Sequence, residues 1–163
     1  MKERYLIDSY PETAGTRFLK QHNLPFLAQY YPQEIEGSAQ FTADYLGLPL
    51  HSIVKSIVFI DESYKGYMVL MHGDCSIDTK RMRKLLGVKK LRPAPFEYAH
   101  KWTGYQFGGT SPFGIRAVLP IYVESTILEL PHLYINGGKR GLILKITPDL
   151  LEFIGAIPVK VAK

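Results

Sequence analysis

The sequence predicts an α+β fold built around a mixed β-sheet. Three observations support this prediction: expected strands outnumber expected helices, at least one pair of strands is typical of a β-hairpin, and no internal repeat or linker-like stretch interrupts the 163 residues. A chain of this length is most simply one domain and can bury a sizeable core. We therefore expect residues 1–163 to form a single domain.

The first elements alternate between helix and strand. Residues 12–23 are expected to form a helix with Thr13 as its N-cap, and residues 26–31 are expected to form a strand. A second helix is expected over 38–47, because Gly47 provides a typical stop after its last turn.

The middle of the chain predicts a hairpin and two further helices. Apolar stretches at 52–60 and 67–72 flank a loose turn, as two strands of a hairpin would. Residues 78–87 are expected to form a capped basic helix with an apolar stripe, and 96–102 a short helix.

The last part of the chain predicts strands followed by a helix. Apolar stretches at 117–124, 133–136 and 142–146 are expected to be strands. Residues 148–155 are expected to close the fold as a helix, since Pro148 suits the first turn.

Composition predicts a soluble intracellular protein. Apolar residues make up 46% and charged residues 21% of the chain, which is ordinary for a globular domain. No apolar run reaches the roughly 18 residues that a membrane span needs, and no signal peptide is evident. The single cysteine, Cys75, fits a reducing compartment. We expect a cytoplasmic location and no membrane partner.

Positive charge is concentrated in residues 80–92, which hold seven basic side chains and no acid. Such a segment is typical of a surface that binds a polyanion such as RNA. A solvated helix face without a partner explains the charge equally well. On the first interpretation, the residues expected to bind tRNA are Lys80, Arg81, Arg83, Lys84, Lys89 and Lys90.

Lys55 is the most unusual residue of the expected hairpin. Strand alternation places it with Ile53 and Ile57, and the opposite face is also largely apolar, so both faces are expected to be buried. A lysine there is costly unless its ammonium group reaches a charge or a cleft. We favour a functional lysine; the alternative is a lysine that extends to solvent at a sheet edge.

Two segments are rich in glycine: 108–114 (GGTSPFG) and 137–141 (GGKRG). Glycine permits positive φ and lets main-chain N–H groups approach a ligand, so these segments predict a site built largely from backbone donors. Ser111 is not expected to be a nucleophile, because Pro112 has no N–H to serve the usual oxyanion hole. Its hydroxyl is expected to form a turn or bind a ligand.

No metal site or cofactor is expected. His72 and Cys75 have a ligand-like spacing, but the sequence shows no two further ligands for a zinc ion. No motif places a pair of acidic residues for acid–base catalysis.

The order of these features resembles the YbaK/ProX family of aminoacyl-tRNA editing domains, related to the insertion domain of bacterial prolyl-tRNA synthetases. The resemblance rests on Lys55-Ser56 in a strand, then the basic helix, then TGYQFGGTSPFG (103–114) and INGGKRGLILKI (135–146), and it covers about residues 13–157. It implies a partly barrel-like mixed sheet flanked by helices. It also implies a hydrolase that cuts the ester of a mischarged tRNA, most like a Cys-tRNA(Pro) deacylase.

The resemblance also implies partners and site residues. The expected partners are the aminoacylated end of tRNA and a synthetase such as prolyl-tRNA synthetase. The expected catalytic residues are Lys55, Gly108 and Gly109, with backbone N–H groups stabilising a tetrahedral oxyanion. The expected substrate-binding residues are Tyr31, Ser56, Thr110, Ser111, Pro112, Gly114, Gly137, Gly138, Arg140 and Gly141.

Two positions depart from the family pattern. Cysteine-specific members commonly carry an acid where this chain has Ile143, and the region of Ser38 and Ala39 lacks an expected phenylalanine. These departures leave the amino-acid specificity open. They also leave open a non-catalytic tRNA- or synthetase-binding module with the same fold. A third hypothesis, an unrelated small-molecule-binding domain, gives the basic helix no function.

Overall fold

Strand β2 (Ile53–Asp61) pairs with three other strands in the computed structural model, which describes residues 9–31 and 38–163. Along one edge it forms the predicted antiparallel hairpin with β3 (Gly66–His72). Along the other edge its first two residues pair in parallel with β6 (Leu133–Asn136). Its last three residues pair antiparallel with β4 (Leu91–Pro93). The two partners on this second edge are therefore separated along β2.

The complete sheet has eight strands in the order β1-β7-β6-β2-β3-β5-β8, with β4 added to β2. Three pairs are parallel (β2–β6, β3–β5 and β5–β8) and the others are antiparallel, so the predicted mixed sheet is confirmed. The remaining strands are β1 (Leu27–Tyr30), β5 (Ile121–Glu124), β7 (Leu142–Ile146) and β8 (Ile157–Val159).

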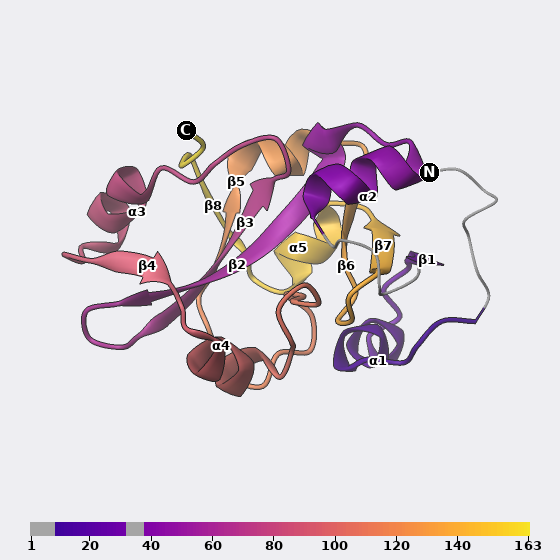
Figure 1. Ribbon diagram of the computed structural model, residues 1–163, viewed down its shortest axis with the longest axis horizontal. Coiled ribbons are helices and arrows are strands. Elements are labelled where there is room, and N and C mark those ends of the chain that lie inside the picture. Colours follow the sequence, from indigo (N-terminus) through magenta and orange to yellow (C-terminus); the bar gives the residue numbers. More distant parts are fainter. Residues whose placement is uncertain (1–8, 32–37) are drawn as a thin grey trace.

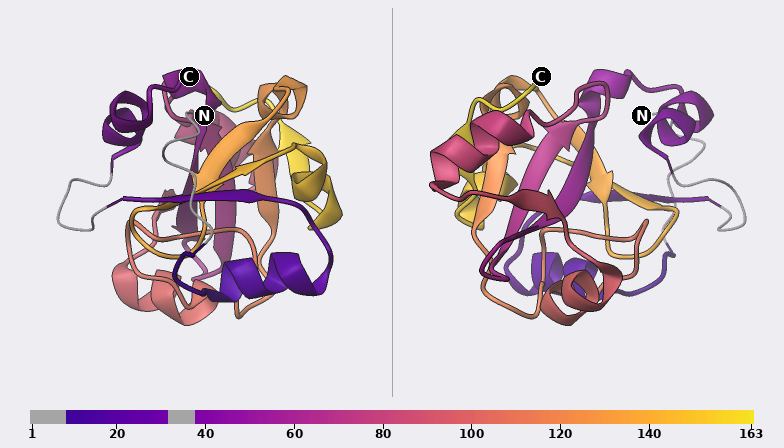
Figure 2. Two further views of the ribbon diagram at one scale, coloured as in Figure 1. Left: turned by 90° about the vertical axis from the view of Figure 1, so that its right-hand side faces the viewer. Right: turned by 60° about the vertical axis from the view of Figure 1, so that its left-hand side comes forward.

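Helices lie around this sheet on more than one side. Helix α2 lies in front of the sheet in Figure 1 and α5 behind it, while α1 and α4 lie together toward the lower end of the strands (Figure 2). None of the described helices is long and apolar enough to cross a bilayer. The helices are α1 (Ala14–Gln21), α2 (Ala39–Leu46), α3 (Thr79–Leu86), α4 (Phe96–Thr103) and α5 (Asp149–Phe153), with short 3₁₀ turns η2 (Leu50–Ser52) and η3 (Ser125–Glu129).

The helix ends follow the capping chemistry that the sequence predicts. The Thr13 side chain accepts a hydrogen bond from the N–H of Thr16 at the start of α1. Gly47 and Gly87 end α2 and α3 with φ of 67° and 71°, in the left-handed region that glycine tolerates. The local sequence therefore sets where these helices begin and end.

Three expectations about strands needed correction. The strand expected over 117–124 begins only at Ile121. The N–H of Ala117 donates to the carbonyl oxygen of Trp102 instead of to a neighbouring strand, and Pro120 has no N–H group. β4 was not expected, since Leu91 and Arg92 continue the basic segment. β8 was also missed, because Pro158 is unfavourable inside most strands.

The two faces of β2 pack against different clusters of apolar side chains. Val54, Val58 and Ile60 belong to the main core, which also contains Leu19 of α1. On the other face, Phe59 packs in a smaller cluster with Met82, the fully buried residue through which α3 contacts the sheet. Both faces of β2 are thus largely buried, as its sequence predicts.

Candidate active site

The edge of β2 between β6 and β4 is open. In the described part of the chain, no strand pairs with residues 55–58 along this edge. The N–H of Gly73, which follows β3, donates to the carbonyl oxygen of Ile53, so Ile53 turns its backbone toward β3. Because backbone groups alternate along a strand, Ser56 turns its N–H and C=O toward the gap. An interior strand therefore presents unpaired backbone groups in the middle of the sheet.

A cavity of about 300 Å³ lies at this gap. Its walls come from β2, β6, β7, α2, the residue after β1, the end of β4 and the first glycine-rich segment, which are far apart in the sequence. It brings together five of the residues predicted for the site: Tyr31, Lys55, Ser56, Gly108 and Thr110. The other lining residues are Ala39, Thr42, Ile53, Val54, Ile57, Val58, Pro93, Ala94, Phe107, Tyr134, Asn136 and Ile143.

The Ser56 hydroxyl is a buried polar group without a partner. Its Oγ atom is inaccessible to solvent and makes no hydrogen bond with the residues that the structure describes. A buried hydroxyl in this state destabilises the fold by about 1–3 kcal/mol. Ser56 is a lining residue of the cavity, but its inaccessible Oγ can bond to a ligand only after the side chain rotates toward the cavity.

Lys55 lines the same cavity and is half-buried. Its Nζ donates a hydrogen bond of 2.7 Å to the carbonyl oxygen of Cys75, so the ammonium group is held by the protein. An ammonium group has three N–H donors. The two that remain have no acceptor among residues 9–31 and 38–163, which leaves them for a ligand.

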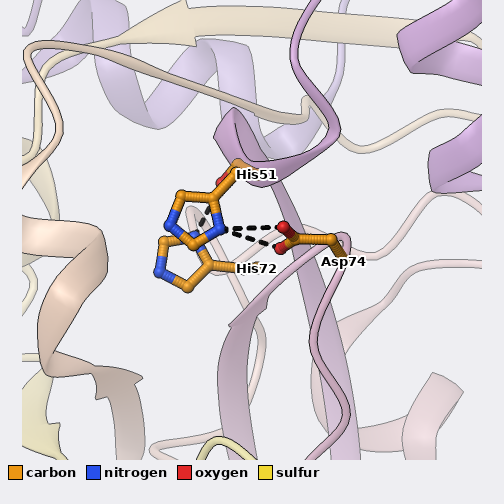
Figure 3. Close-up of side chains that lie close together, drawn as sticks. All are labelled: His51, His72 and Asp74. Carbon is orange, nitrogen blue, oxygen red and sulfur yellow. Dashed lines mark hydrogen bonds and ion pairs between the residues drawn. The ribbon is translucent and has the colours of Figure 1, made fainter.

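The turn that carries Cys75 is fixed by a pair of stacked histidines (Figure 3). The rings of His51 and His72 are parallel within 9°, with centroids 3.7 Å apart. Nδ1 of His51 lies 2.9 Å from the Asp74 carboxylate, and Nδ1 of His72 donates to the carbonyl oxygen of His51. Partial desolvation acts to raise the pKa of Asp74. The hydrogen bonds from His51 and Cys75 outweigh that effect and hold the pKa below its ordinary value.

This cluster also corrects the sequence-based pairing of His72 with Cys75 as ligand candidates. The structure instead brings His51, His72 and Asp74 together, with ligand atoms within 4.8 Å of one another. Both ring nitrogens of His72 already have protein partners, His51 and Thr126. A histidine binds a metal in the plane of its ring, and two parallel stacked rings have no such plane in common. The cluster suits a structural role behind Lys55, and the absence of a metal stays a prediction.

The Cys75 thiol is a poor candidate nucleophile. Partial burial and the hydrogen bond from its Sγ to Asp74 raise the pKa of this thiol. A thiol must lose its proton to attack an ester efficiently. The carbonyl oxygen of Cys75, rather than its sulfur, serves the site by holding Lys55.

The two glycine-rich segments lie against each other. A Cβ atom at Gly109 would be only 3.1 Å from the backbone nitrogen of Arg140, so the absence of a side chain permits this contact. Asn136 joins the segments: its Nδ2 donates to Gly108 O at 2.8 Å, and its Oδ1 accepts from Gly138 N–H at 2.8 Å. Sequence reasoning missed Asn136, although it precedes GGKRG directly.

Three of the six glycines in these segments, Gly109, Gly137 and Gly138, already use their N–H groups inside the protein. Gly109 donates to Gln106 O at 3.0 Å, and Gly137 donates to Leu142 O at 2.8 Å. Gly108 and Thr110 differ, because their N–H groups have no acceptor in the described chain and both residues line the cavity. The candidate oxyanion donors are therefore Gly108, Thr110 and Ser56, and Gly109 is not a free donor in this structure.

The rest of the first segment is packed away from the cavity. Ser111 is fully buried, and its Oγ accepts the N–H of Phe113 in a turn. Pro112 is also buried, and a Cβ at Gly114, where φ is 67°, would collide with the carbonyl oxygen of Ala14 in α1. Burial raises the pKa of Tyr105 to about 12, so its hydroxyl stays protonated and donates to Phe113 O. These residues shape the loop and do not line the cavity.

Gly141, in the second segment, positions Tyr31. With φ of 89°, it approaches so closely that a Cβ atom would lie 2.5 Å from Tyr31 O. The Tyr31 N–H donates to Gly141 O, and the Tyr31 hydroxyl lies 3.0 Å from Oγ1 of Thr42. Tyr31 is thus fixed at both ends while its ring lines the cavity.

The two positions that depart from the family pattern meet beside Tyr31. Ile143 is buried and forms an apolar part of the cavity wall where an acid was expected. Ala39 also lines the cavity, and Phe41, two residues later on α2, packs its ring against that of Tyr31 at a centroid distance of 5.6 Å and an angle of 55°. The lining residues of this end are apolar apart from the hydroxyl groups of Tyr31, Thr42 and Tyr134.

The basic segment is largely exposed and directly precedes part of the cavity wall in the sequence. Lys80, Lys84, Lys89 and Lys90 are exposed, and the N–H groups of Lys89 and Lys90 donate to the carboxylate of Glu62. The segment's Arg81 donates a side-chain hydrogen bond to the carbonyl oxygen of Lys160, and its Arg83 donates one to the carbonyl oxygen of Lys89.

From this segment the chain passes directly into the cavity wall. α3 is followed by β4 (Figure 1). Pro93 at the end of β4 and Ala94 after it line the cavity. The predicted basic helix is confirmed, and its role in binding tRNA stays a prediction.

Most of the residues that form the cavity belong to a stretch of sequence that matches a known family. Residues 36–153, which include Lys55 and both glycine-rich segments, match the model of the aminoacyl-tRNA editing domain.

Individual relatives agree with this match. An Enterococcus faecalis protein provisionally named Cys-tRNA(Pro)/Cys-tRNA(Cys) deacylase EbsC is 26% identical over 141 residues, 86% of each chain. The proline–tRNA ligase of Ligilactobacillus salivarius is 27% identical over 82% of this chain, which matches 24% of the ligase. A crystal structure provisionally described as a trans-editing enzyme for prolyl-tRNA synthetase superposes with a TM-score of 0.81 at 26% identity, covering 94% of this chain and 99% of the other.

Proposed function

The chain belongs to the aminoacyl-tRNA editing domain family, and from this premise we propose that it is a trans-editing deacylase that hydrolyses the ester of a mischarged tRNA. The substrate most consistent with its relatives is Cys-tRNA(Pro), by analogy with the Enterococcus faecalis protein.

The open edge of β2 is the observation that carries this proposal. It gathers a cation and unpaired N–H groups around one cavity: Lys55 and the backbone of Ser56, Gly108 and Thr110. Ester hydrolysis develops negative charge on the carbonyl oxygen, and preorganised donors stabilise that charge. The ester enters with its carbonyl oxygen toward these donors.

A water molecule is the proposed nucleophile. Ser111 is buried within its loop, and the raised pKa of the Cys75 thiol keeps it protonated. Aminoacyl esters are already activated, so a positioned water needs no covalent intermediate. In this mechanism the attack forms a tetrahedral oxyanion, which collapses to release the amino acid and the 3′-hydroxyl of the tRNA.

Lys55 binds the nucleotide part of the substrate. Its two remaining N–H donors suit a phosphate oxygen or a ribose hydroxyl, and a hydrogen bond from a cation to a phosphate is stronger than one between neutral groups. The bond to Cys75 O fixes where these donors lie. This arrangement explains a lysine on an otherwise apolar strand.

The amino-acid side chain occupies the end of the cavity near Tyr31. Ile143 gives this end an apolar wall, and the Tyr31 and Thr42 hydroxyls face each other at 3.0 Å. A small and weakly polar side chain such as that of cysteine fits these surroundings, whereas a charged one would lose its hydration without a partner. The acceptor stem of the tRNA extends from the cavity toward α3.

A panel of mischarged tRNAs tests the proposal by release of free amino acid. Cys-tRNA(Pro) is expected to be hydrolysed faster than correctly charged Pro-tRNA(Pro). Binding of the tRNAs without release of any amino acid would favour the non-catalytic module. A pull-down with prolyl-tRNA synthetase tests the second expected partner.

A further inference from the structure

Two phenylalanine rings are exposed beside the cavity. Phe107 is 58% exposed and Phe96 41% exposed. Their rings meet edge to face, with centroids 5.2 Å apart and planes at 86°. The His100 ring stacks on Phe96 at 5.3 Å, and its Nδ1 donates to Tyr105 O. The fold therefore holds apolar rings in place at the surface without burying them.

These rings stand at the mouth of the cavity. Phe107 is itself a lining residue and directly precedes Gly108, one of the candidate oxyanion donors. Phe96 follows Ala94, another lining residue, by two positions. A group attached to an ester in the cavity would therefore pass Phe107 on its way out.

The charges around the rings favour an anion. Exposed Arg140 extends its side chain along Gly108, and exposed Arg92 precedes Pro93 in the cavity wall. Among the described residues, Glu97, next to Phe96 in the sequence, carries an opposing charge. A flat apolar ring with a cation beside the next residue matches a nucleotide, which combines a flat base with a phosphate.

We propose that Phe107, supported edge-on by Phe96, is a stacking platform for the terminal base of the aminoacylated tRNA. This inference rests on the proposed function, because it places the amino-acid ester in the cavity. The base is joined to the same ribose as the ester, so it lies within one nucleotide of the oxyanion donors. Stacking on Phe107 holds the ribose in place and leaves the ester carbonyl facing Gly108.

The test compares cysteinyl-adenosine with the cysteinyl ester of ribose that lacks a base. Phe107→Ala is expected to lower kcat/KM about five-fold or more on cysteinyl-adenosine, the effect of removing one base–aromatic stack. The decrease in kcat/KM on the base-free ester should be much smaller, because that ester has no base to stack, and Phe107→Trp should retain wild-type values on both. Phe153→Ala is the matched control, because Phe153 is 53% exposed and packs on Phe18 and His22 away from the cavity.

The outcomes separate this inference from the proposed function. Equal decreases on both esters would mean that Phe107 only shapes the cavity, which overturns the platform and leaves the deacylase intact. If wild-type protein hydrolyses neither ester nor any mischarged tRNA, the proposed function fails. In that case, the affinity for the trinucleotide CCA tests the stacking platform by itself. An affinity that is about five-fold or more lower in Phe107→Ala than in the wild-type protein supports the platform, and an unchanged affinity overturns it.

Discussion

The two glycine-rich segments and the open edge of β2 differ in how much of their backbone is left free: in the segments Gly108 and Thr110 offer N–H groups at the cavity, while other N–H groups are used in packing. In the glycine segments, the N–H groups of Gly109, Gly137 and Gly138 all bond within the protein. Along β2, Ser56 keeps an unpaired backbone edge and an unpartnered hydroxyl at the cavity. Glycine here mainly permits close packing, and an interrupted sheet supplies much of the free polar surface.

This difference implies two kinds of mutational sensitivity. Substitutions in the packed glycine segments should reduce stability first, because neighbouring backbone leaves no room for a side chain. Substitutions along the β2 edge should reduce activity first, because the groups there have few partners in the folded protein. Variants in each region test whether stability and activity are affected separately in this way, and they follow from the largest expected effect to the smallest.

Gly114→Ala should destabilise the protein by about 3 kcal/mol or more, since left-handed strain adds about 1–2 kcal/mol to the cost of overpacking against Ala14. Gly87→Ala is the matched control: φ is similar, at 71°, but no atom lies within 4 Å of the added Cβ. It should cost only about 1–2 kcal/mol. Urea unfolding measures both, and equal destabilisation would show that the first glycine segment is not tightly packed.

Lys55→Ala should lower deacylation at least about 100-fold, equivalent to about 2.7 kcal/mol in the transition state. Its unfolding free energy should change by less than about 1 kcal/mol, because the side chain is half-buried and makes one hydrogen bond. Lys65→Ala, an exposed lysine in the turn of the same hairpin, is the control. Near-normal activity in folded Lys55→Ala would contradict the assignment of Lys55.

Ser56→Ala and Ser52→Ala should have opposite consequences. Ser56 Oγ has no partner in the described structure, so its removal should leave stability unchanged or slightly higher while lowering kcat/KM about ten-fold. Ser52 Oγ donates to Pro49 O at 2.7 Å, so its removal should cost about 1 kcal/mol of stability and little activity. Thermal unfolding and deacylation assays on both variants test this contrast.

Much of this fold could be predicted from local sequence, but the gap in β2 could not. Thr13, Gly47 and Gly87 mark helix ends, and alternation in 52–60 and 67–72 predicts the hairpin. The gap depends on β4 and β6 pairing with different parts of β2, and such distant pairing leaves no local pattern.

The same reasoning explains the outcome for the candidate site. Lys55 was identifiable because a lysine is out of place on an apolar strand. Asn136 was not, because its role depends on two segments that meet only in the folded chain. The stacking of His51 on His72 depends likewise on a contact between η2 and the end of β3.

The smallest effect on cavity chemistry is expected from the basic segment. Replacing Lys80, Arg81 and Lys84 with alanine should weaken tRNA binding and flatten its salt dependence by about 0.7 log unit for each phosphate that the variant no longer neutralises. Hydrolysis of cysteinyl-adenosine should barely change, because these side chains do not line the cavity. An unchanged salt dependence would make this segment a solvated surface without a role in binding.

Exhaustive chelation should also leave deacylation unchanged, because the proposed mechanism stabilises the oxyanion with N–H donors rather than a Lewis acid. The assay compares protein treated with chelator against protein supplied with zinc. Activity that disappears with chelator and returns with zinc would contradict this mechanism and would direct attention to His51, His72 and Asp74.

Amide hydrogen exchange with a non-hydrolysable analogue, cysteine joined to adenosine through an amide, tests the central claim most directly. We predict that the analogue slows exchange at Ser56, Gly108 and Thr110, whose N–H groups become bonded or shielded in the cavity. Exchange at Gly109, Gly137 and Gly138 should already be slow in the free protein and should change little. Protection confined to these three glycines, with Ser56 unaffected, would contradict the account and place the ligand outside the open edge of β2.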